Sequence, residues 1–193
     1  MLTLTLFSII WVLLIYVCNC IVARKIPHIG FRKLSLYMLT MAALGLFGEF
    51  VFDTIYKSIF GSPLWVYHLL PIHNGYTSLY SLYLWGTIGF HLYLLHGMLE
   101  NRKSTSIHSL AAIFCIEAII MEAFVNITHL LLFDSYIYYY LPADLWHITS
   151  LQTLPLYLLA GYITVLAMSY ARRLPNYAYP GNCAVLCVLI KLG

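Results

Sequence analysis

Long runs of apolar residues, separated by short polar segments, divide the chain. Each run is about twenty residues long, which is the length an α-helix needs to cross roughly 30 Å of hydrocarbon. Apolar residues fill the whole circumference of each predicted helix instead of one stripe, as is typical of helices in lipid. The pattern predicts an all-α fold, a polytopic transmembrane helix bundle with five spans: Leu2–Val22, Leu34–Tyr56, Thr77–Leu99, Ile107–Leu132 and Leu151–Tyr170.

Two further apolar stretches are not ordinary spans. Ser58–Gly75 contains Pro63 and Pro71, which break a long helix, so we expect it to lie along the outer membrane interface or to dip back into the protein, where it would form a lid. Ala184–Leu192 is about half the length of a span and predicts a short sixth helix or a tail on the membrane surface. No linker or internal repeat of the transporter kind is evident. Residues 1–193 are therefore expected to form a single integral membrane domain.

Basic residues collect after alternate spans, and this asymmetry predicts the orientation. Eight of the ten lysines and arginines follow the first, third and fifth spans: Arg24, Lys25, Arg32, Lys33, Arg102, Lys103, Arg172 and Arg173. Loops rich in Lys and Arg stay in the cytoplasm. The N-terminus is therefore expected outside, with the loops after spans one, three and five cytoplasmic, in a plasma or inner membrane.

Composition excludes several classes of protein. Hydrophobic residues make up 62% of the chain and charged residues 9%, which excludes an ordinary water-soluble enzyme. A net charge of +3 leaves no basic surface for nucleic acid. The five cysteines lie mostly in apolar runs and the eight histidines are scattered, so neither set predicts a disulfide framework or a metal site. No cofactor motif is present, and an interfacial aromatic belt is expected to include Tyr136, Tyr138, Tyr139 and Tyr140.

Three carboxylates lie inside predicted spans, where a charged side chain costs at least about 2.5 kcal/mol. They are Glu49, Glu117 and Glu122. Counted from the cytoplasmic end of its helix at about 1.5 Å per residue, Glu49 lies roughly 22 Å deep, and Glu122 lies at the same depth. Because their helices run in the same direction, these two residues are able to face each other.

Other polar residues extend from each of these two glutamates at helical spacing. Asp53 follows Glu49 by four positions, while Asn126 and His129 follow Glu122 by four and seven. Both stripes rise toward the predicted outer face, where His147 also lies. The candidate catalytic residues are Glu49, Glu122, Asp53, Asn126, His129 and His147. The alternative is that these groups only hydrogen-bond one helix to another.

A facing pair of glutamates has a chemical consequence. Two carboxylates at low dielectric do not both stay ionised, so one of them is expected to hold a proton. A neutral carboxylic acid beside a carboxylate is able to act as a general acid on a double bond or an epoxide, or to serve in a proton relay.

Several residues resemble the pattern of the CmpB-like family of small membrane proteins, which carry a type IV ABC-transporter label. The matching residues are Gly48-Glu49, Gly75-Tyr76-Thr77-Ser78, Trp85-Gly86 and Glu122, within Leu39–Gly161. The resemblance implies that the two glutamates form a site. The chain departs from the family at Ile137–Tyr140, where the pattern would place Trp-Asp-Tyr-Ser.

Three hypotheses about function follow. The first is a small integral membrane enzyme that acts on a lipidic or isoprenoid-like substrate through a buried acid/base pair. The second is a transporter or channel subunit that uses the same carboxylates as a proton or ion relay. The third is a scaffold for a larger membrane protein. Membrane lipid is the expected surrounding partner, and a homo-oligomer is compatible with a bundle this small.

Overall fold

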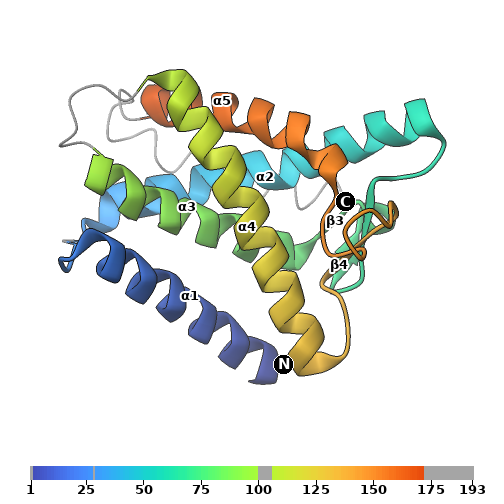
Figure 1. Cartoon of the computed structure of the whole chain (residues 1–193), viewed down its shortest axis with the longest axis horizontal. Helices are drawn as coiled ribbons and strands as arrows, with labels where there is room; N and C mark the ends of the chain where they lie inside the picture. The colour runs from blue at the N-terminus through green and yellow to red at the C-terminus, as the bar shows by residue number, and fades with distance from the viewer. Residues whose placement is uncertain (1, 28, 100–105, 172–193) are drawn as a thin grey trace.

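The computed structural model describes residues 2–27, 29–99 and 106–171, and this part of the chain is a bundle of five α-helices (Figure 1). Short strands lie together at one end of the bundle, in the two loops that join α2 to α3 and α4 to α5. The helices are α1 (Leu2–Ala23), α2 (Phe31–Phe60), α3 (Leu79–Leu99), α4 (Ile107–Phe133) and α5 (Leu154–Ala171). The strands are β1 (Trp65–Tyr67), β2 (Pro71–Ile72), β3 (Thr77–Ser78) and β4 (Tyr138–Tyr140).

Three helices in the described part are long and apolar enough to cross a membrane: α1 from Thr3, α2 and α4. Many of their large apolar side chains are exposed, among them Ile10, Phe47 and Leu131. An extended apolar surface of this kind is typical of a protein that contacts lipid or a partner protein. The predicted sixth segment, Ala184–Leu192, lies outside the described residues.

The Ser58–Gly75 stretch dips back into the protein, which is one of the two forms expected of it. Its first residues continue α2 to Phe60, where Gly61 in the left-handed conformation ends the helix. The chain then turns back into the bundle, and Leu64 is completely buried. The loop therefore forms part of the core.

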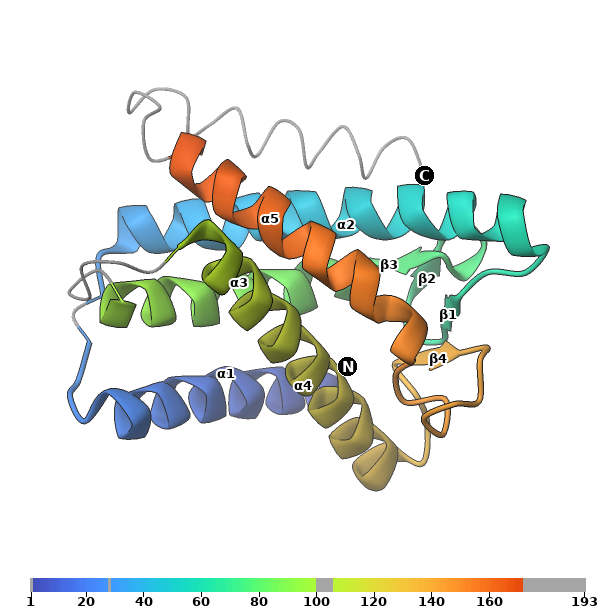
Figure 2. The same ribbon diagram turned by 45° about the horizontal axis from the view of Figure 1, so that its top comes forward.

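Two helical hairpins, α2–α3 and α4–α5, cross each other, and α1 lies beside α3 (Figure 2). Within each hairpin a glycine allows the closest approach. A Cβ on Gly89 would lie 2.6 Å from the Tyr37 carbonyl oxygen, and a Cβ on Gly161 would lie 2.6 Å from the Ala111 carbonyl oxygen. Small residues at such crossings let helices in lipid pack backbone to backbone.

The loops of the two hairpins share several backbone features. A left-handed residue, Gly61 or Asp134, ends the first helix of each hairpin. Ile72 pairs with Thr77 in the first loop, as Leu145 pairs with Thr149 in the second. Consecutive residues with positive φ lie inside each of these turns: His73, Asn74 and Gly75 in one, Trp146 and His147 in the other.

β1 and β4 join the two loops into one antiparallel ribbon. Val66 lies opposite Tyr139, and these residues occupy equivalent places in the two loops. The flanking hydrogen bonds are paired in the same way: His68 N donates to Ile137 O at 2.9 Å, and Leu141 N donates to Leu64 O at 3.0 Å. An antiparallel pair in which a residue faces its own counterpart has a local two-fold axis at that position.

The bundle thus contains an internal repeat that the sequence analysis did not find. Residue 49 of the first half corresponds to residue 122 of the second, a difference of 73. The second loop is one residue shorter, so that Thr77 corresponds to Thr149 with a difference of 72. Because α2 and α4 are equivalent first helices of the two hairpins, we describe the two halves as parallel repeats.

Candidate functional site

Glu49 is a buried carboxylate on α2 that accepts four hydrogen bonds. Thr77 Oγ1 and Ser81 Oγ donate to Oε2 at 2.5 and 2.6 Å, while Trp85 Nε1 donates to Oε1 at 2.8 Å together with the Tyr67 hydroxyl. A carboxylate has about four acceptor positions, so Glu49 is fully solvated by protein donors. This arrangement stabilises an anion without a basic partner.

Trp85 reaches Glu49 because of a glycine one turn earlier on α2. A Cβ on Gly45 would lie 2.0 Å from Cγ of Trp85, so only glycine leaves room for the indole at this place. The indole lies against α2 and donates to Glu49. The spacing of Gly45 and Glu49 therefore positions a donor from the neighbouring helix.

Glu122 is the equivalent carboxylate on α4 and has a similar but looser set of partners. The Tyr140 hydroxyl donates to Oε1, and Thr149 Oγ1 donates to Oε2 at 3.1 Å. The Tyr157 hydroxyl also hydrogen-bonds this carboxylate. With three donors instead of four, Glu122 keeps an acceptor position for another group.

The two sets of donors correspond through the repeat. Tyr67 lies 18 positions after Glu49, and Tyr140 lies 18 positions after Glu122. The threonine of each set follows its glutamate by 28 and 27 positions. The two carboxylates are therefore the two halves of one site around the two-fold axis.

Burial keeps the tyrosine donors of the ribbon protonated. Desolvation raises the pKa of the Tyr67 hydroxyl well above its usual value, and the negative charge of Glu49 raises it further. The pKa of Tyr140 is raised in the same way by burial and by Glu122. Both hydroxyls consequently act as hydrogen-bond donors.

Both glutamates line one large cavity between α2 and α5. It has a volume of about 410 Å³, within the usual range for ligand sites. Phe47 of α2 and Leu159 of α5 line the cavity and are more than half exposed on the outer surface, so the cavity opens sideways between the two helices. Six aromatic side chains surround its inner end: Trp65, Tyr67, Trp85, Tyr138, Tyr140 and Tyr157.

The equivalent space between α3 and α4 is nearly filled. It holds two small cavities of about 40 and 20 Å³. Trp11 of α1 lines the larger one, is buried, and stacks on Phe124 of α4 with 5.4 Å between ring centroids. α1 therefore closes the opening between α3 and α4, whereas the equivalent opening between α2 and α5 remains.

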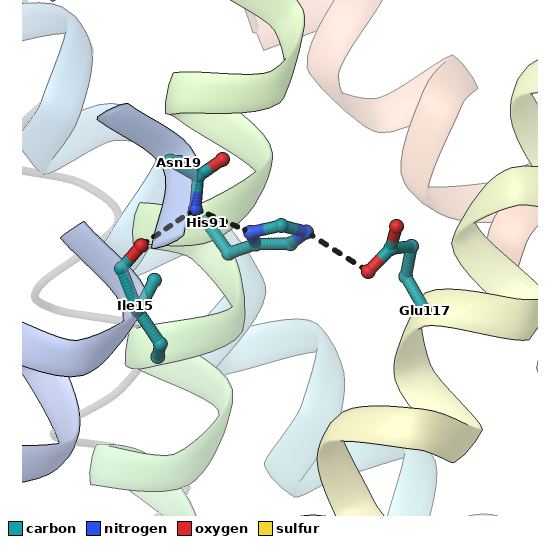
Figure 3. Close-up of polar contacts among 4 residues, drawn as sticks. All are labelled: Ile15, Asn19, His91 and Glu117. Carbon is teal, nitrogen blue, oxygen red and sulfur yellow. Dashed lines mark hydrogen bonds and ion pairs between the residues drawn. The ribbon is translucent and has the colours of Figure 1, made fainter. Parts of the chain in front are cut away.

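A polar bridge fixes α1 on that side (Figure 3). Asn19 Nδ2 donates to the Ile15 carbonyl at 2.8 Å and lies 2.9 Å from His91 Nδ1 of α3. His91 Nε2 lies 3.4 Å from an oxygen of Glu117 on α4. His91 and Glu117 are thus partners in a link from α1 through α3 to α4.

Of the six candidate catalytic residues, Glu49 and Glu122 meet at the cavity, and the other four do not line it. Asp53 Oδ1 accepts from Leu64 N at 2.6 Å. Asn126 Oδ1 accepts from Ile137 N at 3.1 Å, at the equivalent place in the second loop. Each of these side chains anchors the loop that carries the ribbon.

The two histidines also contact loop backbone. His129 Nδ1 lies 2.7 Å from the Ser135 carbonyl, and its ring packs edge-on against Phe7. His147 Nδ1 lies 2.6 Å from the Tyr140 carbonyl. Both histidines therefore stabilise the backbone of the second loop.

Sequence reasoning missed most of the groups that surround the carboxylates. Tyr138 and Tyr140 were expected to face the membrane interface, but both are buried in the ribbon. The signal available in the sequence was the recurrence of a tyrosine at the same distance after each glutamate. The missed donors are Tyr67, Thr77, Ser81, Trp85, Tyr140, Thr149 and Tyr157.

In the described ranges, no group of three or more His, Cys, Asp and Glu side chains has the arrangement of a metal site. Comparison with family models, curated proteins and solved structures finds no match to this chain. The paired carboxylates and their cavity are therefore the features of the described chain that bear on its function.

Proposed function

We propose that the protein is a small integral membrane enzyme that acts on a lipidic or isoprenoid-like substrate by acid/base chemistry. The observation that carries this proposal is the position of Glu49 and Glu122 at the inner wall of an apolar cavity that opens sideways. Charged groups are costly in such surroundings and are usually functional. An apolar substrate in the membrane would reach them without passing through water.

The two glutamates have different roles in the proposed reaction. Glu122, with its free acceptor position, gives its proton to one carbon of a double bond and leaves a carbocation on the other. Loss of a proton from the carbon beside the cation then returns the proton to Glu122 and forms a new double bond. No other reactant is consumed, and the net change is migration of the double bond.

The surroundings of the carboxylates suit a cationic intermediate. Glu49 accepts four hydrogen bonds, which favour its anionic form, and as an anion it would stabilise the positive charge. The faces of aromatic rings stabilise cations as well, and six aromatic side chains line the inner end of the cavity. Exclusion of water would protect the cation from hydrolysis.

The placement in the membrane is part of the same proposal. We propose that α3 and α5 also span the bilayer, which gives five spans, with the N-terminus outside and the loops after spans one, three and five in the cytoplasm of a plasma or inner membrane. The clustering of basic residues after these spans supports this orientation. The resemblance to the CmpB-like family is likewise a proposal.

Deuterated water tests the reaction for any lipid substrate, whatever its structure. The purified protein is incubated with a lipid extract of its source membrane in deuterated water, and the lipids are analysed by mass spectrometry. We expect one lipid to gain deuterium, because the acid would carry deuterium to carbon. Glu122→Gln should slow this exchange by about 10²–10⁴-fold.

The matched control is Glu117→Gln, which alters an intramembrane glutamate that does not line the large cavity. It should leave exchange within about twofold of the wild-type rate, since uncoupled sites contribute independently. If no lipid gains deuterium, or if Glu122→Gln exchanges like wild type, the acid/base proposal is wrong.

The internal repeat favours one second candidate, a proton-coupled transporter. Parallel two-fold repeats with a polar site between them are known architectures of secondary transporters. In sealed liposomes this function predicts proton movement that depends on Glu49 and Glu122, with no deuterium in any lipid. The two experiments together separate the candidates.

A further inference from the structure

The large cavity offers a ligand acceptors and very few donors. Every aromatic donor at its inner end is already engaged. Trp65 Nε1 donates to the Tyr76 carbonyl at 2.9 Å, and the Tyr138 hydroxyl donates to the Glu122 carbonyl at 2.9 Å. The other four aromatic donors, Tyr67, Trp85, Tyr140 and Tyr157, bond the two carboxylates. A polar group that reaches the two carboxylates therefore pairs best there when it is a donor itself.

The charge of the cavity gives a second constraint. Among the described residues that line it, Glu49 and Glu122 are the acidic ones, and none is a lysine or arginine. An anionic group at the inner end would meet repulsion from the carboxylates. A cation would be attracted by the carboxylates and by the faces of the aromatic rings, which is the chemistry that binds quaternary ammonium groups elsewhere.

The shape of the cavity adds a third constraint. Of the two openings that the repeat makes equivalent, the one between α2 and α5 is open and the one between α3 and α4 is closed. In the described chain, the bridge to α1 has no counterpart at the open side. Through the repeat, Leu44 corresponds to Glu117, and Ile163 corresponds to His91. Gly48 at the open side corresponds to Met121 at the closed side. A Cβ on Gly48 would meet no atom within 4 Å, so the missing side chain leaves free space.

We infer that the cavity between α2 and α5 binds a single-chain amphiphile with a cationic amine head, which enters sideways with the head at Glu49 and Glu122 and the chain along Gly48. This inference rests on the proposed function and deepens it, because an ammonium at that place imitates the carbocation of the proposed reaction. Stable imitations of a transition state bind more tightly than substrates.

Three brominated amphiphiles of the same undecyl chain test the inference, with an amine, an alcohol or a sulfate as head. Bromine quenches tryptophan fluorescence on contact. The Trp11→Phe and Trp146→Phe background leaves Trp65 and Trp85, which both line the cavity, as the reporters. We expect saturable quenching by the amine at roughly tenfold lower concentration than by the alcohol, and none by the sulfate.

Two substitutions on α2 then test the route of entry. Gly48→Met installs the side chain found at the equivalent position of α4 and should abolish quenching by the amine. Ile59→Met, at an exposed position of the same helix, should leave it unchanged. Equal quenching by all three heads, or full quenching of Gly48→Met, overturns the inference.

Replacement of both glutamates by glutamine supplies a second measurement on the head. The double variant should bind the amine no more tightly than the alcohol, and a preference that survives overturns the inference. Saturable amine binding without deuterium exchange would leave the inference standing and the enzyme proposal wrong. Exchange that the amine does not inhibit would support the enzyme and overturn the inference.

Discussion

Asp53 and Asn126 occupy the same position in the two repeats, and their side chains differ in one atom: an oxygen in Asp53 is the nitrogen Nδ2 in Asn126. Both side chains accept from a loop amide 11 positions later, Leu64 N or Ile137 N. Asn126 forms two further hydrogen bonds: its Nδ2 donates to the carbonyls of Tyr138 and Ile148 at 2.9 and 3.1 Å. The amide is therefore required in the second repeat and not in the first.

Exchange of the two residue types should have unequal effects. Asn126→Asp would direct a carboxylate oxygen at two carbonyl oxygens and is expected to cost about 2–4 kcal/mol. Asp53→Asn keeps the acceptor for Leu64 N and is expected to cost less than about 1 kcal/mol. Thermal unfolding in detergent measures both. Equal destabilisation would show that the assigned hydrogen bonds do not hold the loops.

At the scale of residues, the two carboxylates could be predicted from the sequence. The side chains that donate hydrogen bonds to them could not. The equal depth of Glu49 and Glu122 follows from counting along two helices. Their donors come from loops, and a loop's path depends on contacts such as the burial of Leu64 that no local pattern expresses. The sequence shows that Asp53 and Asn126 each follow a glutamate by four positions. It does not show that their side chains point toward loop amides.

Among the elements, the hairpin crossings depend on Gly89 and Gly161, each of which lies against the backbone of the helix before it. We expect Gly89→Ala and Gly161→Ala to separate the helices and to cost about 1–3 kcal/mol each. Gly86 is the matched control, because a Cβ there would meet nothing within 4 Å. Gly86→Ala should be neutral or slightly stabilising. Unfolding in detergent measures all three, and equal costs would contradict this packing.

The helices were predictable because run length and hydropathy alone determine a helix in lipid. All five predicted ranges overlap observed helices, with ends displaced by a few residues. The strands were not predictable, since β1 and β4 have three residues each and pair across the two halves. A pattern of period two needs more positions than that to be recognised.

The whole molecule is a repeated hairpin with an added helix on one side. The repeat escaped the sequence analysis because few side chains are identical between the halves, although Tyr67 and Tyr140, or Gly89 and Gly161, correspond. What is retained is the backbone of the loop and the type of each donor. These appear only when the two loops are compared in space.

The bridge between Asn19, His91 and Glu117 should behave as one coupled unit. Glu117→Leu alone leaves His91 without its partner, and His91→Ile alone leaves a carboxylate unpaired, so each should cost about 1–3 kcal/mol. The double variant installs the residue types of the open side and should cost about 1 kcal/mol less than the sum. Unfolding of the four proteins in detergent gives this coupling, and additive costs would show that the bridge is not formed.

The ribbon of β1 and β4 also bears on how such a molecule could arise. Two identical chains of one hairpin each, related by the same two-fold axis, would supply both strands and both glutamates. Such a homodimer would have two entrances or none, because symmetry forbids a difference between them. Fusion of the halves into one polypeptide removes that restriction. It allows a single entrance, and with it a single orientation for whatever lies between the two glutamates.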